Sequence, residues 1–128
     1  MTSNSQTGKR NIMVLRLYFP HAARVAHSRL WHHLSRPSLA NHLLHLAKKD
    51  GIDQALLHHV DAGYLHGDTR IRHRHVEHSH RNLPQCLELI DTEATLRAFC
   101  KTHRHQLALA RVLLLPCEVI DDHGLGLD

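Results

Sequence analysis

A histidine-rich stretch, IRHRHVEHSH at residues 71–80, is the part of the sequence best suited to chemistry. Its histidines alternate with arginines, so an extended backbone would divide the imidazoles between two sides. Imidazoles two residues apart, completed by a carboxylate, can bind a borderline-soft ion such as Zn²⁺, Cu²⁺ or Ni²⁺. The alternative is a surface loop that binds added metal only weakly. The candidate metal ligands are His73, His75, Glu77, His78 and His80.

The arginines of the same region suggest a second kind of site, one for an anion. Guanidinium groups bind phosphate and carboxylate groups through charge-assisted hydrogen bonds. The candidate anion contacts are Arg70, Arg72 and Arg74, and the residues expected to shape the base of the loop are Gly63, Tyr64 and Gly67. The alternative is a surface hairpin without a ligand. Aromatic residues make up only 4% of the chain, so bases would find few stacking partners and no nucleic acid is expected.

Catalytic patterns are missing from the sequence. No nucleophile is paired with a base, and neither a Walker-type phosphate loop nor an HExxH motif occurs. Adjacent His58 and His59 on an expected strand would face opposite sides, and a hydrogen-bonded core histidine explains them better than a general base. We therefore expect a protein without enzymatic activity.

Composition and charge point to a cytoplasmic protein with anionic partners. Among 128 residues, Lys and Arg exceed Asp and Glu by 4, and 16 histidines add positive charge as the pH falls below 7. No apolar run approaches the roughly 20 residues of a membrane-spanning helix, and residues 1–11 lack the apolar centre of a secretory signal. The three cysteines form no CxxC pair, and we expect reduced, buried thiols.

The apolar pattern divides the chain into one domain, residues 12–120, between a disordered tail at 1–11 and a second tail at 121–128. Helices are expected from Pro37 to Asp50, ended by Gly51, and after a cap at Asp91 or Thr92. A long loop covers residues 64–82. Strands are expected at residues 12–19, 52–62, 83–91 and 108–120.

The order β-α-β-β-α-β predicts an α+β, ferredoxin-like fold, in which a four-stranded antiparallel sheet carries both helices on one face. The first strand is apolar on both sides, with Leu15 and Leu17 on one and Val14 and Tyr18 on the other. A large apolar sheet face that is exposed to solvent is unusual in a monomer. We therefore expect a cyclic homo-oligomer that covers it.

These segments resemble the PII-like signalling proteins known as domain of unknown function family 190. The resemblance is carried by LRLYF at 15–19, PSLANHLLHLAKKDGI at 37–52, AGY at 62–64, NLPQCLELID at 82–91 and VLLLPCEVI at 112–120. It implies a ferredoxin-like homotrimer whose sheets line a central barrel. It also implies that the loop at 64–82 lies beside inter-subunit clefts where PII proteins bind ligands such as adenine nucleotides. Such loops engage a target protein, often a membrane transporter or channel.

Two functions therefore stand side by side. The first is a PII-like regulatory protein that binds a small anionic ligand, such as an adenine nucleotide, between subunits and acts on a partner through the loop at 64–82. The second is a metal-binding or metal-homeostasis protein that uses the histidine-rich loop for Zn²⁺, Cu²⁺ or Ni²⁺.

Overall fold

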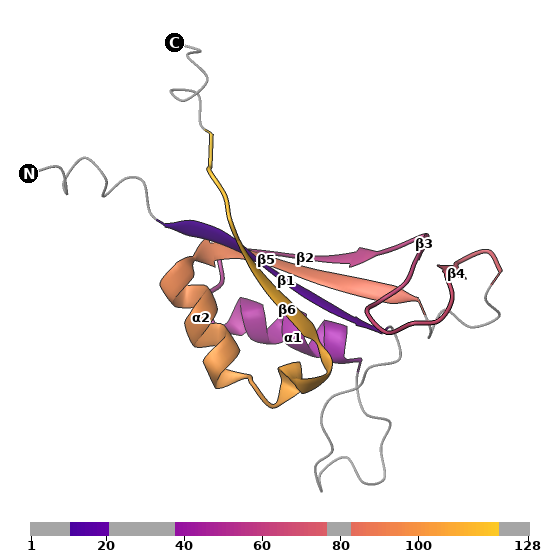
Figure 1. Cartoon of the computed structure of the whole chain (residues 1–128). Coiled ribbons are helices and arrows are strands. Elements are labelled where there is room, and N and C mark those ends of the chain that lie inside the picture. The colour runs from indigo at the N-terminus through magenta and orange to yellow at the C-terminus, as the bar shows by residue number, and fades with distance from the viewer. Residues whose placement is uncertain (1–10, 21–37, 77–82, 121–128) are drawn as a thin grey trace, which may run out of the picture.

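The structure is a computed structural model, which describes residues 11–20, 38–76 and 83–120. Its elements confirm the predicted β-α-β-β-α-β order and add a short hairpin and a 3₁₀ helix (Figure 1). In chain order they are β1 (Ile12–Pro20), α1 (Leu39–Lys49), β2 (Gln54–His59), β3 (Ala62–Gly63), β4 (Arg72–His73), β5 (Pro84–Thr92), α2 (Glu93–Thr102), η4 (Gln106–Leu109) and β6 (Arg111–Pro116).

The four long strands form one antiparallel sheet in the order β2-β5-β1-β6, which is the ferredoxin-like arrangement. Both helices cover the same face of this sheet, as Figure 1 shows. The opposite face is called the open face below. Strands β1 and β5 lie in the middle, while β2 and β6 form the two edges. The hairpin of β3 and β4 is a separate two-stranded sheet.

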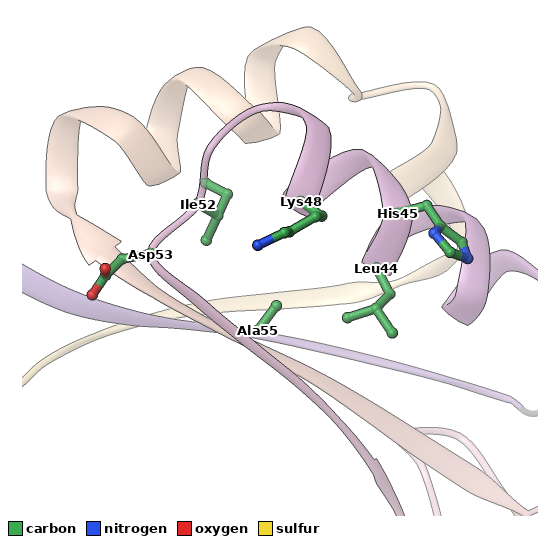
Figure 2. A pocket seen from close by; sticks show the side chains of 6 residues that line it. All are labelled: Leu44, His45, Lys48, Ile52, Asp53 and Ala55. Atoms are coloured by element: carbon green, nitrogen blue, oxygen red, sulfur yellow. The ribbon is translucent and has the colours of Figure 1, made fainter.

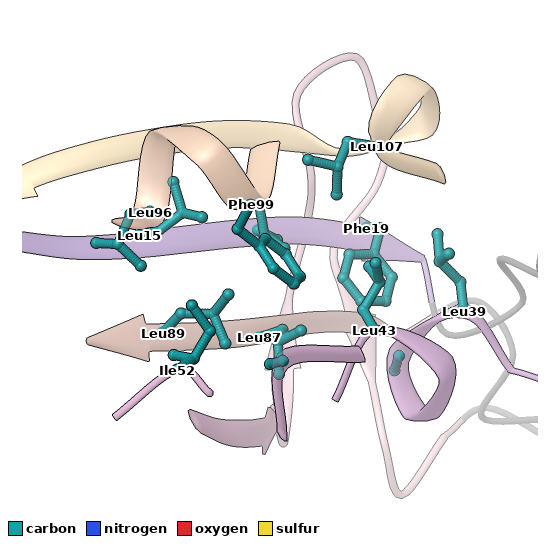
Figure 3. Packing of buried hydrophobic residues seen from close by; sticks show 13 residues of the cluster. Leu15, Phe19, Leu39, Leu43, Ile52, Leu87, Leu89, Leu96, Phe99 and Leu107 are labelled. Carbon is teal, nitrogen blue, oxygen red and sulfur yellow. The ribbon is translucent and has the colours of Figure 1, made fainter. Parts of the chain in front are cut away.

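The core lies between the sheet and the helices. Because side chains alternate along a strand, every second residue of β1 points at the helices, and Leu15, Leu17 and Phe19 are at most 2% exposed. Leu87 and Leu89 of β5 are fully buried beside them. Figure 3 shows how the strands and both helices supply this cluster, which the 3₁₀ helix completes with Leu107.

Helix α1 follows the predicted apolar stripe, since Leu39, Leu43 and Ala47 are buried against the sheet. It begins at Leu39, two residues after the predicted start at Pro37, which lies outside the described residues. The C-terminal end is as expected. Gly51 follows with a φ of +79°, a left-handed conformation that favours glycine.

Helix α2 is capped by Thr92, whose hydroxyl accepts a hydrogen bond from the Thr95 amide at 3.3 Å. Asp91, the other predicted cap, instead accepts a 2.8 Å hydrogen bond from the Asp53 amide and so ties the end of β5 to the segment before β2. Asn11, which we expected in the N-terminal tail, donates to Glu93 of α2 at 2.6 Å. Residues 1–10 and 121–128 lie outside the described residues.

The predicted second and fourth strands are too long. Strand β2 starts at Gln54 because the Ile52 amide is still bound to the end of α1, through the Ala47 carbonyl at 3.0 Å. Residues 108 and 109 of the predicted strand 108–120 belong instead to the 3₁₀ helix η4 (Gln106–Leu109), whose buried Leu107 anchors it. Pairing of β6 with β1 ends at Pro116, opposite Met13, because β1 begins only one residue earlier.

The alternation in β1 alone predicted a wholly apolar open face. The open face instead combines apolar and charged side chains. At its centre, Arg16 Nε lies 3.1 Å from Glu88 Oε2, and His58 Nε2 lies 3.9 Å from the other carboxylate oxygen of Glu88. A hydrogen bond with Tyr18, and then one with Glu88, raises the pKa of Arg16. The apolar side chains around this charged group are Val14, Leu56, Ile90, Leu113 and Leu115.

The cysteine prediction is wrong in part. Cys86 is buried and Cys100 is half-buried, but Cys117 is exposed just after β6. The pKa values of the Cys86 and Cys100 thiols are raised, mainly because both groups are removed from water. The raised pKa values keep both thiols protonated and unreactive. Within the described residues, neither α-helix has the length and apolar composition needed to cross a membrane.

Candidate ligand site at the base of the loop

A cavity of about 620 Å³ lies at the end of the sheet where β1 stops and β6 begins. One wall is the strand pair, and the other is the start of the segment that connects β3 to β4. The residues that line it are Tyr18, Pro20, Tyr64, Leu65, His66, Asp68, Ala108, Leu109, Ala110, Arg111 and Leu113. This volume falls in the range of small-molecule sites.

The strand register sets the first wall. Tyr18 of β1 pairs directly with Arg111 of β6, so a phenol ring and a guanidinium group lie side by side. Both belong to the open face, as does Leu113, which pairs with Arg16. A second molecule that covered the open face would therefore also close this side of the cavity.

The second wall is a tight turn at residues 65–68. The Leu65 amide donates to Asp68 Oδ2 at 2.7 Å, and the Asp68 amide donates back to the Leu65 carbonyl at 3.0 Å. Gly67 closes the turn with a φ of +89°, which side-chain-bearing residues rarely adopt. This turn holds Tyr64 and His66 at the cavity, although Tyr64 is 65% exposed.

The lining suits a flat, negatively charged ligand. Tyr64 and Leu109 are 65% and 70% exposed and offer apolar surface. Arg111 and His66 can donate hydrogen bonds to an anion, whereas the Asp68 carboxylate is occupied by the turn. The arrangement provides an aromatic and aliphatic surface for a ring and a cationic side for an acidic group.

The residues predicted to contact an anion do not all lie at this cavity. Tyr64 lines the cavity and Gly67 shapes its turn, whereas Gly63 lies in β3. Arg72 lies in β4, and neither Arg70, Arg72 nor Arg74 lines the cavity. Arg74 turns back to the hairpin, where Nη2 donates to the Val60 carbonyl at 3.4 Å and Nε lies 3.5 Å from Asp61 Oδ1.

The predicted metal ligands are described only in part. His73 and His75 lie close together, with ring centroids 5.5 Å apart in an edge-on arrangement. Glu77, His78 and His80 lie outside the described residues. Within the ranges that the structure describes, no three His, Cys, Asp or Glu side chains are grouped so that they could hold a metal ion.

His58 and His59 are both exposed rather than buried, because β2 is an edge strand. His58 lies on the open face beside Glu88. His59 Nδ1 lies 3.2 Å from the Gln85 side-chain nitrogen, which is a hydrogen bond between neighbouring strands.

Sequence reasoning named one of the lining residues, Tyr64. Those it missed include the four whose side chains matter most for a ligand: Tyr18, His66, Leu109 and Arg111. Tyr18 and Arg111 are 93 positions apart, and only the β1–β6 register brings them together. Leu109 was assigned to a strand, although it ends the 3₁₀ helix. An available signal was the single arginine at the start of an otherwise apolar last strand, RVLLLP.

Comparison with known proteins connects this geometry to a family. The family model for DUF190, described as "Uncharacterized ACR, COG1993", matches residues 12–119. No curated protein sequence matches the chain.

Two of the solved structures that match the chain show the same fold. CutA1 from Oryza sativa has a TM-score of 0.54 at 9% identity, and the match covers 86% of this chain and 83% of that one. The divalent ion tolerance protein CutA1 from Ehrlichia chaffeensis has a TM-score of 0.54 at 10% identity, and the match covers 92% of both chains. At such low identity these likenesses establish the ferredoxin-like fold alone.

Proposed function

The chain belongs to the DUF190 family, and from this premise we propose that it is a non-enzymatic, PII-like regulatory protein. It binds a small anionic ligand, such as an adenine nucleotide, in the cavity at the base of the loop at residues 64–82. Ligand binding then changes how this loop contacts a target protein, such as a membrane transporter or channel.

The observation that supports the proposal is the cavity of about 620 Å³ beside Tyr64 and Arg111. The adenine ring of a nucleotide would lie against the exposed faces of Tyr64 and Leu109. The phosphates of the same nucleotide would reach Arg111 and His66. The turn at residues 65–68 joins the cavity wall to the rest of the loop. A ligand that fixes Tyr64 therefore acts directly on the segment that would meet the target.

The proposal includes a homotrimer. The open face has large apolar side chains that the single chain leaves partly uncovered, with Leu56 and Leu113 at 46% and 38% exposed. Packing three open faces around an axis would cover them. Because Tyr18 and Arg111 belong to that face, the neighbouring copy would supply the missing wall of the cavity.

Isothermal titration calorimetry with ATP, ADP and AMP tests the ligand. We expect saturable binding at one site per chain. Arg111→Ala should weaken binding of ATP about tenfold or more, since a hydrogen bond to a charged group contributes about 1.5–3 kcal/mol. Tyr64→Ala should weaken all three nucleotides alike because it removes the surface under the base.

Arg97→Ala is the matched control, because Arg97 lies on α2 and pairs with Glu93 at 2.8 Å, away from the cavity. It should bind ATP as the parent does. Equal affinities for the parent and Arg111→Ala, or no heat with any nucleotide, would contradict the proposal.

A metal-binding function is a second candidate, favoured by the contact between His73 and His75. One structural neighbour is titled a divalent ion tolerance protein, and two adjacent imidazoles could begin a similar role here, with Glu77, His78 and His80 completing the set. Titration with Zn²⁺, Cu²⁺ and Ni²⁺ tests it. His73→Ala and His75→Ala should each lose binding, whereas His105→Ala, an exposed histidine before η4, should not. Unchanged metal affinity in the first two variants would exclude this site.

A further inference from the structure

The C-terminal ends of the two helices are joined by one contact. His103, which caps the end of α2, has its Nε2 2.7 Å from Oδ2 of Asp50, which caps the end of α1. The His103 ring also packs against that of Phe99, with centroids 4.6 Å apart. The residues beside Asp50 and His103 therefore share one surface of the helix layer, away from the β3–β4 hairpin (Figure 1).

Cations lie on both sides of this contact. Lys49 precedes Asp50, while Lys101 and Arg104 lie before and after His103 in the sequence. All three cationic residues are exposed, and none of them forms an ion pair within residues 11–20, 38–76 and 83–120. Lys49, Lys101 and Arg104 are called the basic patch below.

The acidic side chains of the helix layer do not neutralise the basic patch. Helix α1 contains no acidic residue, and the Asp50 carboxylate beside it is bound by His103. Glu93 of α2 lies 2.8 Å from Arg97 and accepts a 2.6 Å hydrogen bond from Asn11. The positive charge of the patch is therefore available to a partner in solution.

Lys48 is a neighbouring cation that does not belong to the patch. Figure 2 shows its side chain turned into a cavity of about 330 Å³ beside β2, between Ile52 and Ala55. That cavity lies toward the edge of the sheet, and none of the three patch residues lines it. The patch is thus a feature of the helix layer and not of the sheet edge.

The make-up of the patch indicates the kind of partner. The large apolar side chains that are exposed in the described chain lie in strands, loops and η4, and none lies in α1 or α2. Protein interfaces are usually centred on buried aromatic and apolar anchors, which this surface lacks. Long cationic side chains without such anchors suit a partner whose negative charges can rearrange to meet them, as the headgroups of anionic lipids do.

We propose that the basic patch docks the protein on an anionic membrane surface. The contact is electrostatic and peripheral, between the three cations and lipid headgroups. Neither the nucleotide nor the loop at residues 64–82 takes part in it. A protein docked in this way holds its β3–β4 hairpin away from the bilayer (Figure 1), where the loop can reach those parts of a target that project from the membrane.

Co-sedimentation with vesicles tests the patch, using phosphatidylcholine with and without phosphatidylserine. Each cation near an anionic surface raises partitioning about fivefold. The triple variant Lys49→Gln, Lys101→Gln and Arg104→Gln should therefore bind the mixed vesicles about 100-fold more weakly than the parent. Raising the salt concentration from about 0.1 to about 1 M shortens the Debye length from about 10 to about 3 Å and should release the parent.

The matched control is the triple variant Arg70→Gln, Arg72→Gln and Arg74→Gln. It removes the same number of positive charges, but at the β3–β4 hairpin. The control should bind the mixed vesicles as the parent does, because a contact made by the patch does not depend on the net charge alone. Light scattering of the three proteins verifies that they assemble alike.

Several results would overturn the proposal: equal binding by the parent and the patch variant, an equal loss in both triple variants, or no binding of the parent to the mixed vesicles. Binding of the parent to phosphatidylcholine alone would also overturn it. If labelled duplex DNA binds the parent but not the patch variant, and vesicles bind neither, the patch serves nucleic acid instead. Nucleotide titration decides the proposed function separately, since Tyr64 and Arg111 lie outside the patch.

Discussion

Replacing Leu56 by Ala tests whether a second copy covers the open face. Leu56 lies in β2 opposite Glu88 and is 46% exposed in the single chain. Burying a whole leucine side chain stabilises by about 1.5–3 kcal/mol. The part of Leu56 that remains exposed would therefore contribute about 0.7–1.4 kcal/mol for each copy if an assembly covered it.

A trimer contains this contact three times, which gives about 2–4 kcal/mol for each assembly. At about 1.4 kcal/mol for each factor of ten, the association constant of Leu56→Ala should fall by about 30- to 1000-fold. Because trimer formation depends on the square of the monomer concentration, the concentration of half-dissociation should rise by about 5- to 30-fold.

Light scattering of both proteins, diluted from micromolar to nanomolar concentration, measures this shift. Ile71→Ala is the control, since Ile71 is 57% exposed in the loop and lies outside the sheet. A Leu56→Ala protein that dissociates at the same concentration as the parent would refute the argument that the open face is buried between copies.

Three further predictions concern the single chain. Leu87 is fully buried between Leu57 and Leu17, so Leu87→Ala should lower the free energy of unfolding in urea by about 2–5 kcal/mol. A loss under about 1 kcal/mol, with a dependence on urea concentration equal to that of the parent, would show that the core is not packed as described. Burial, and then the nearby charges of His103 and His45, lower the pKa of His42, so the unfolded chain takes up a proton first as the pH falls. The stability that neutral His42 contributes is thus complete above about pH 6.5 and is lost as the pH drops through the folded pKa of His42. In urea titrations, the free energy of unfolding should decrease less from pH 7.5 to pH 5.0 for His42→Gln than for the parent. Equal decreases in the two proteins would contradict this. Since raised pKa values keep the Cys86 and Cys100 thiols protonated, Cys86→Ser with Cys100→Ser should leave the native alkylation rate at pH 8 unchanged, and a slower rate would mean that one of them reacts.

The sequence was sufficient for the parts of the fold that depend on local pattern. Alternation in LRLYF predicts which side of β1 is buried, and Leu15, Leu17 and Phe19 are at most 2% exposed. The apolar spacing of α1 and the glycine after it predict the helix face and its end. These features follow from side-chain periodicity and backbone geometry, which neighbouring residues determine.

The candidate site depends on contacts that local pattern does not determine. Arg111 reaches the cavity only because its strand pairs with β1 in the register that places it opposite Tyr18. Arg74 was expected to face a ligand, yet its guanidinium contacts Val60 and Asp61 within its own hairpin. A run of arginines in a sequence gives the charge of a loop but not the direction of each side chain.

The central position of β1 also bears on how the protein is made. Leu15 pairs with Leu89 on one side and with Leu114 on the other, so the sheet has a high contact order. A nascent chain that has emerged from the ribosome only as far as α2 can place β1 beside β5, but it still lacks the β6 edge. The positions of Leu114 and Val112 beside β1 stay empty until β6 has also emerged. The sheet is therefore expected to be completed only after β6 has left the ribosome, and a chaperone that binds apolar strand edges has that interval in which to act.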